Sequence, residues 1–181
     1  MRTSPAKYLL VPLPKTPYSR IGPTTWQDYY VKLGRTAKIA RNLMDGGNQV
    51  TVAIISAFQP PGKPSEIDIY CQALRDLAPE LTVRAIREAT ETVGQIERSF
   101  RLAQEMNARV IFISTWMHYP RVRYLARGKP ARHYGAFGIP QPAFLFLDPL
   151  FLIFQPLGDL LGMTSFLRRA IIRERERGRI L

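Results

Sequence analysis

The sequence is short of cysteine and of acidic residues. Its only cysteine, Cys71, excludes an internal disulfide and a zinc cluster held by cysteines, because each needs at least two thiolates. Only 14 aspartates and glutamates stand against 26 lysines and arginines, which leaves a formal net charge of +12 and a pI near 10.3. Such an excess favours anionic partners, which could be phosphates, nucleic acid or an acidic membrane surface.

No export signal is visible at the start of the sequence. Arg2 and Lys7 precede an apolar stretch that reaches only to Pro14, which is shorter than the ~7–15 residues of a signal-peptide core. Together with the lone cysteine, this favours a reducing compartment. We expect a cytoplasmic protein that could also contact a membrane peripherally.

The most hydrophobic stretch, from Ala143 to Met163, is interrupted by the carboxylates of Asp148 and Asp159 and by prolines. A spanning helix needs ~20 largely apolar residues, so the pattern disfavours a transmembrane segment. It favours a helix packed on the domain, and the alternative is an interfacial segment that touches a membrane through Phe144 to Phe154.

The length of 181 residues suits one domain, since domains commonly have roughly 100–200 residues. We assign residues 1–166 to an α/β domain that includes the C-terminal docking helix. Residues 167–181 form a basic tail, in which Glu174 and Glu176 alternate with arginines as on a solvated helix.

Short apolar runs alternate with helical patterns along the chain. The runs are typical of strands buried on both faces, and the helical stretches begin with capping residues such as Ser65. The expected strands are Tyr8–Val11, Val50–Ser56, Leu81–Arg87 and Val110–Ser114, and the expected helices are 25–43, 66–77, 90–106 and 121–127.

This alternation predicts right-handed βαβ units, and therefore a Rossmann-like, doubly wound, mostly parallel sheet of about five strands with helices on both faces. In such sheets, ligands bind beyond the carboxyl ends of the strands. The loops that begin at Leu13, Ser56, Glu88 and Thr115 are therefore the places where we expect a site.

Two stretches in the middle of the chain carry a family resemblance. Residues 87–95 read REATETVGQ, and residues 110–121 read VIFISTWMHYPR. They resemble the YdcF/SanA/ElyC-like family, the domain of unknown function numbered 218, which has a glutamate before a Ser/Asn-Thr-x-x-Asn stretch and a His-x-x-Arg turn after a strand. The matching residues are Glu88, Thr92, Ser114, His118 and Arg121, with Gln95 where an asparagine is common.

Further features extend the resemblance from Tyr8 to about Phe166. Ser65-Glu66 is similar to the family's Ser-Glu-Ala, which marks Glu66 as a ligand-binding candidate, and residues 35–46 and 151–163 resemble two of its helices. The departures lie after the first two strands, where the family has glycines. This chain reads PLPKTP and SAFQPP there, so the usual pocket could be reshaped or lost.

The resemblance implies a Rossmann-like fold, S-adenosylmethionine binding as in some members, and cell-envelope or peptidoglycan metabolism as in others. On that basis the ligand would be a phosphorylated or adenosyl small molecule, or a lipid phosphate. The alternative is a non-catalytic basic module with a degenerate pocket, which docks to nucleic acid or to an anionic membrane.

Position and chemistry suggest roles for the candidates. His118 could act as an acid or base and Arg121 as an anion clamp, although His118 could instead only cap the following helix. Glu88 could orient His118 or accept hydrogen bonds from a ligand, or it could pair with Arg87 or Arg121. Ser114 and Thr92 offer hydroxyls that could equally be local hydrogen-bonding groups.

Basic and aromatic residues also mix between Arg121 and Tyr134. They could form a nucleic-acid patch, but a solvated basic helix face is the commoner explanation. A serine hydrolase is disfavoured because no nucleophile elbow surrounds Ser56, and no metal site is expected with only two histidines and no carboxylate pairs beside them.

Overall fold

A computed structural model describes residues 4–14, 26–59, 62, 64–137, 150, 152–154, 156–163, 165–166, 169 and 172–173, with the side chains of 26–29 excepted. The loop expected up to Thr24, the stretch from Phe144 to Pro149 and most of the tail lie outside these residues. The elements are β1 (Lys7–Pro12), α1 (Trp26–Asp45), β2 (Gln49–Ile55), α2 (Glu66–Leu77), β3 (Thr82–Ile86), α3 (Thr92–Met106), β4 (Arg109–Thr115), α4 (Tyr119–Leu125) and β5 (Ala131–Ala136).

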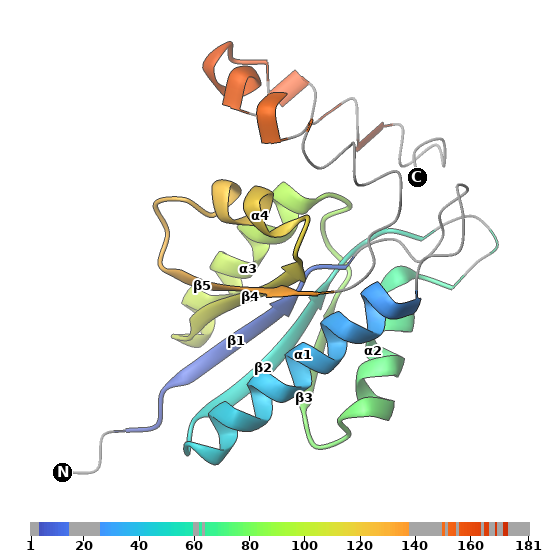
Figure 1. Cartoon of the computed structure of the whole chain (residues 1–181), viewed down its shortest axis with the longest axis vertical. Coiled ribbons are helices and arrows are strands. Elements are labelled where there is room, and N and C mark those ends of the chain that lie inside the picture. Colours follow the sequence, from blue (N-terminus) through green and yellow to red (C-terminus); the bar gives the residue numbers. More distant parts are fainter. Residues whose placement is uncertain are drawn as a thin grey trace.

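The five strands form one parallel sheet in the order β3-β2-β1-β4-β5 (Figure 1). The chain builds outward from β1 to β3 and then returns to the other side of β1 with β4 and β5. This is the doubly wound arrangement predicted from the alternation of strands and helices. The expected α/β, Rossmann-like fold class is confirmed.

Helices cover both faces of the sheet, as the uninterrupted apolar strands require (Figure 1). Successive side chains of a strand point to opposite faces, so Leu10 lies in the core beneath α1 and α2, while Leu9 and Val11 lie in the core beneath α3. All three side chains are fully buried. Burial on both faces explains why these strands show no polar alternation.

Local capping sets most element boundaries near their expected positions. Ser65 is the N-cap of α2, as predicted, and its hydroxyl accepts a hydrogen bond from the Asp68 amide. Gly47 follows α1 with a φ of 76°, and its amide bonds the Met44 carbonyl, as a C-terminal stop requires. Helix α4 begins two residues earlier than predicted, with Pro120 in its first turn.

The basic stretch after β4 is only partly helical, which corrects the expectation of one solvated helix face. Arg132 and His133 lie on β5, an edge strand that pairs with β4. Arg132 is exposed, whereas the His133 ring stacks on Phe112 with centroids 5.6 Å apart. The turn through Gly128 (φ 75°) separates the two elements.

In the described part of the C-terminal segment, the large apolar side chains are exposed, whereas the sequence favoured a helix packed on the domain. Leu150, Ile153, Phe154 and Leu160 are all exposed, and Leu160 retains 82% of its accessible surface. The segment meets the domain through polar groups near α4, above which it lies in Figure 1. No helix that the structure describes is long and apolar enough to cross a bilayer.

Candidate functional site

The strand order creates a switch point at the carboxyl ends of β1 and β4. Connections from β1 and β4 leave toward opposite faces here, which opens a crevice in sheets of this type. The amide of Leu13, just after β1, bonds the Ile113 carbonyl at 3.0 Å, so the two strands remain paired up to the edge. The two strands are therefore held together at the edge where sheets of this type bind ligands.

Buried polar groups are concentrated at this carboxyl edge. Burying a polar side chain costs free energy unless it is hydrogen-bonded, so such groups are usually few. Ten polar or charged residues are buried among those described, and eight lie at strand ends, in the first turns of the following helices, or reach the edge from α1. The eight are Lys32, Ser56, Ser65, Glu66, Glu91, Gln95, Ser114 and Thr115.

Lys32 and Glu66 place opposite charges above neighbouring strands. The Lys32 ammonium donates to the Leu13 carbonyl at 2.7 Å and lies 5.1 Å from the centroid of the Tyr70 ring. The Ser56 hydroxyl, after β2, donates to the Glu66 carboxylate at 2.6 Å. Glu66 and Tyr70 share one face of α2 because they are four residues apart. The ammonium and the carboxylate thus face the same part of the edge.

Sequence reasoning identified Glu66 but missed Lys32. A signal existed, because Lys32 lies four residues before Thr36 and eight before Ala40, both on the buried side of α1. A lysine on that side must find a polar partner. The partner, a carbonyl after β1, is 19 residues away and is not visible in the local pattern.

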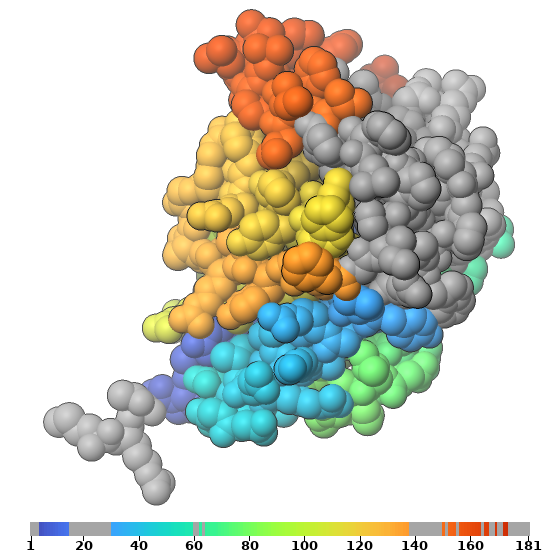
Figure 2. All heavy atoms as spheres, viewed as in Figure 1, coloured from blue at the N-terminus to red at the C-terminus, as the bar shows by residue number. Residues whose placement is uncertain are grey.

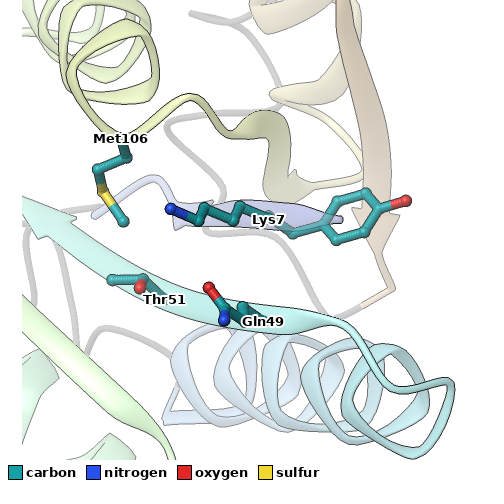
Figure 3. Close-up of a pocket in the computed structure, with 5 residues that line it drawn as sticks. Lys7, Gln49, Thr51 and Met106 are labelled. Atoms are coloured by element: carbon teal, nitrogen blue, oxygen red, sulfur yellow. The ribbon is translucent and has the colours of Figure 1, made fainter. Parts of the chain in front are cut away.

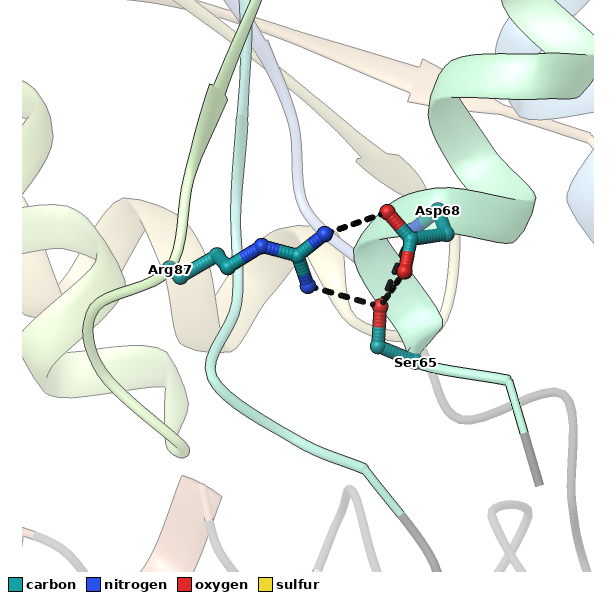
Figure 4. Close-up of polar contacts among 3 residues, drawn as sticks. All are labelled: Ser65, Asp68 and Arg87. Atoms are coloured by element: carbon teal, nitrogen blue, oxygen red, sulfur yellow. Dashed lines mark hydrogen bonds and ion pairs between the residues drawn. The ribbon is translucent and has the colours of Figure 1, made fainter. Parts of the chain in front are cut away.

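On the β3 side of the edge, the chain neutralises its own charges. The Ser65 hydroxyl donates to Asp68, and Arg87 donates to both, at 3.0 Å to the hydroxyl and 2.6 Å to the carboxylate (Figure 4). The hydrogen bond from Ser65, followed by that from Arg87, lowers the pKa of Asp68 below its ordinary value of 3.8. A carboxylate of the chain therefore already lies in the first turn of α2.

At the N-terminus of α3, a carboxylate of the chain is itself the cap. The Glu91 carboxylate accepts hydrogen bonds from the amides of Val93 at 2.6 Å and Gly94 at 2.7 Å. These amides are the ones that would otherwise bind an anion at a helix start. Thr92 is half-buried and Gln95 is buried, both in this first turn.

Glu88 lies at the same edge but faces a different partner from those expected. Its carboxylate is 2.8 Å from the Arg98 guanidinium, which also bonds Glu105 at 3.0 Å. Two strands separate β3 from β4. At ~4.8 Å per strand, their ends are about 14 Å apart. The sheet order therefore does not place Glu88 beside His118, and the ion pair forms with Arg98 rather than Arg87 or Arg121.

His118 and Arg121 lie together in the turn from β4 into α4. His118 is the N-cap residue, and its carbonyl accepts from the Val122 amide at 3.0 Å, but its imidazole makes no capping bond. His118 thus occupies the N-cap position that the alternative gave it, but it caps the helix through its backbone rather than its imidazole. Both side chains are half-buried, and Ser114 at the end of β4 is buried.

Other groups missed from the sequence lie beside this turn. The Thr115 hydroxyl is buried and has no hydrogen-bond partner among the described residues. Trp116 and Phe137 stack with centroids 6.3 Å apart, and Phe137 is 82% exposed. A hydroxyl and an aromatic surface thus accompany the imidazole and the guanidinium after β4.

A shallow hollow lies at the opposite edge of the sheet. Lys7, Tyr8, Gln49, Thr51 and Met106 line it, and Figure 3 shows the Lys7 side chain lying across it. Lys7 and Gln49 begin neighbouring strands, so this is the amino edge rather than the edge where α/β sheets bind ligands. Within the described part of the chain, no three His, Cys, Asp or Glu side chains gather as a metal site would require.

Fold and site together define a Rossmann-like α/β protein with a polar carboxyl edge. No protein-family model matches the chain, and no curated protein matches its sequence. The fold class thus follows from the structure itself.

Proposed function

We propose that this protein binds a phosphate- or adenosyl-containing small molecule at the carboxyl edge of the sheet, beside β4. The gathering of eight of the ten buried polar residues at that edge carries the proposal. Polar groups that lie away from water and converge on a switch point are what a small-molecule site needs.

Electrostatics favour the β4 end of the edge for the anionic part of the ligand. Asp68 already places a carboxylate in the first turn of α2, and the Glu91 carboxylate caps α3. After β4, by contrast, the candidate groups are the Arg121 guanidinium, the His118 imidazole and the Thr115 hydroxyl. An arginine presents a planar fork that suits phosphate oxygens, and the other two groups can donate single hydrogen bonds.

The aromatic stack supports a ligand that also has a flat ring. Trp116 and Phe137 present aromatic surface at the same edge of the sheet as Arg121. Every nucleic-acid base has a flat aromatic face that can stack on an aromatic side chain, so an adenine ring would suit this surface. The specific choice of S-adenosylmethionine, and a role in the cell envelope, rest on the family resemblance alone.

A chemical step at this site would use His118 as acid or base. Of the two histidines, only His118 follows the carboxyl end of a strand. Glu88 has no part in this scheme as an orienting group, because its carboxylate pairs with Arg98. If turnover is found, His118→Ala should abolish it while leaving the fold and ligand binding close to normal.

Ligand binding tests the proposal directly. Thermal-shift and calorimetric titrations would use S-adenosylmethionine, ATP, inorganic phosphate and a polyprenyl phosphate, since a ligand of the native state raises stability with its affinity. Arg121→Ala should weaken binding by about tenfold or more, as for a lost charged hydrogen bond. Arg123→Ala is the matched control, since Arg123 is exposed on the same helix. Equal losses in both variants, or no binding to any probe, would contradict the proposal.

Exposed cations on α4 and β5 favour nucleic acid as a second candidate ligand. Arg123, Arg127, Lys129 and Arg132 are all exposed. The Arg127 guanidinium lies 3.7 Å from the centroid of the Tyr124 ring, and the Lys129 ammonium lies 4.9 Å from that of Phe100. Cations beside aromatic rings are typical of single-strand binding. Affinity for a labelled oligonucleotide that falls steeply with salt, and that small ligands do not change, would favour this candidate over the first.

A further inference from the structure

The exposed apolar surface of this protein is concentrated in one short segment. Of the fifteen large hydrophobic residues that are exposed in the described part of the chain, nine lie between positions 150 and 166, with exposures from 37% to 82%. We call these nine residues the C-terminal apolar face. They are Leu150, Leu152, Ile153, Phe154, Leu157, Leu160, Leu161, Met163 and Phe166.

Polar contacts attach this segment to the domain, which turns its apolar side chains outward. The Asp159 carboxylate accepts hydrogen bonds from the Tyr124 hydroxyl at 2.9 Å and from Arg127 at 3.3 Å. The Arg127 guanidinium lies 3.7 Å from the centroid of the Tyr124 ring and so holds both groups in place. A surface helix normally does the reverse, burying its apolar side and exposing its polar side. Figure 2 shows the described part of the C-terminal segment, in orange and red, above the yellow α4 region.

An apolar surface that faces outward in this way needs a partner, because monomeric proteins rarely expose large contiguous apolar patches. We infer that the C-terminal apolar face docks on an anionic membrane surface, with its aliphatic and aromatic side chains at the boundary between headgroups and acyl chains. The inference is independent of the carboxyl-edge site.

Charge selects this partner over a second copy of the chain. Six arginines and only two glutamates follow the apolar face between positions 167 and 181, and the described Arg169 and Arg173 are exposed. Arginines beside exposed leucines and phenylalanines are typical of segments that lie in the membrane interface and attract anionic lipids. A second copy would carry the same net charge of +12, so the two chains would repel each other.

Vesicle flotation tests the docking. The full chain should float with vesicles of phosphatidylcholine and phosphatidylglycerol, float poorly with phosphatidylcholine alone, and lose part of its binding at high salt. The double variant L160E/L161E should bind at least about tenfold more weakly, because both leucines would leave the acyl boundary. The matched control is Leu77→Glu, since Leu77 is 38% exposed on α2, on the opposite face of the sheet from α4. It should bind like the original chain.

A fluorescent label gives a second readout that does not depend on a destabilising change. Cys71 is only 3% exposed, so a Leu160→Cys variant would react with an environment-sensitive dye at position 160 alone. Its emission should shift to the blue when anionic vesicles are added, whereas a dye on Leu77→Cys should not respond. Absence of both flotation and shift would overturn the inference. So would a dimer that L160E/L161E dissociates while vesicles remain unbound, because the face would then join two copies.

Discussion

The two sides of the carboxyl edge manage their charges differently. On the β2 and β3 side, the Ser65 hydroxyl caps α2 and the Glu91 carboxylate caps α3, and Arg87 and Arg98 each pair with a carboxylate. On the β1 and β4 side, a buried lysine bonds a backbone carbonyl, and a half-buried histidine and arginine follow the strand. On the first side, charged groups of the chain pair with one another. The second side concentrates hydrogen-bond donors and positive charge.

This contrast shows that position at a strand end does not by itself make a residue part of a site. Glu88 and His118 both follow the carboxyl end of a strand, as the sequence suggested. Only His118 lies on the side where cations exceed carboxylates, because β3 and β4 occupy different halves of the sheet.

Lys32→Ala should have the largest effect on stability. The change removes a nearly fully buried side chain together with its hydrogen bond to Leu13, and large-to-small changes in a core cost about 2–5 kcal/mol. We expect the free energy of unfolding to fall by about 2–4 kcal/mol in urea titrations. Lys38→Ala, an exposed lysine on the same helix, should change it by less than about 0.5 kcal/mol. A similar small change for both variants would show that the ammonium does not support the edge.

Glu91→Ala should come next, because it removes the carboxylate that caps α3. Loss of an N-cap costs about 0.5–2 kcal/mol, and two short bonds to amides place this site toward the upper end. Urea unfolding should therefore show a loss of about 1–2 kcal/mol. Glu97→Ala, an exposed glutamate on the same helix, provides the comparison. A loss as large in that variant would mean that capping is not the cause.

Much of the sheet could be predicted from the sequence because its inner strands are buried on both faces. The apolar runs at Tyr8, Val50 and Val110 can be recognised without knowing which strands lie beside them. A strand buried on both faces is apolar along its whole length. The Ser65 cap is equally local, because the hydroxyl and the amide that it accepts from are three residues apart.

Strand β5 and the pairing of the charged groups could not be predicted in the same way. An edge strand has one unpaired side and carries polar residues, so the polar Arg132 and His133 concealed the strand pattern of β5. The residues Gly128 to Pro130 did indicate the turn before it. The partner of Glu88 depends on how α3 crosses the sheet, which places Arg98 within 2.8 Å. Such contacts depend on tertiary packing, not on local pattern.

His133 should make stability depend mildly on pH. Burial, and then the charge of Arg123, lower the pKa of His133 below its ordinary value of 6.5, so the unfolded chain binds the proton more readily. Stability should therefore be complete above about pH 6.5 and should fall as the pH drops toward the folded pKa, by less than about 1.4 kcal/mol per pH unit. Urea unfolding at several pH values should show this slope, and His133→Gln should flatten it. His118→Gln is the control, and a slope that disappears only in that variant would assign it to the other histidine.

Arg87→Ala should have the smallest effect and gives the sharpest test of the contrast between the two sides. Arg87 and Asp68 are 58% and 55% exposed, and exposed ion pairs contribute about 0–1 kcal/mol, so unfolding should change by less than that. The pKa of Asp68 should rise only part of the way to 3.8, because the larger cause of its lowering is the hydrogen bond from Ser65. The stability linked to Asp68 is present above pH 3.8 and is lost as the pH falls through the folded pKa.

The same variant should leave ligand binding unchanged, in contrast to Arg121→Ala. Both arginines follow a strand at the same edge, but Arg87 bonds the Asp68 carboxylate on the β2 and β3 side, whereas Arg121 lies beside β4. Calorimetry with the ligand that binds the original chain compares the two losses directly. If Arg87→Ala weakens binding as much as Arg121→Ala, the ligand extends across the β2 and β3 side. The chain's own carboxylates would then not have closed that side to an anion.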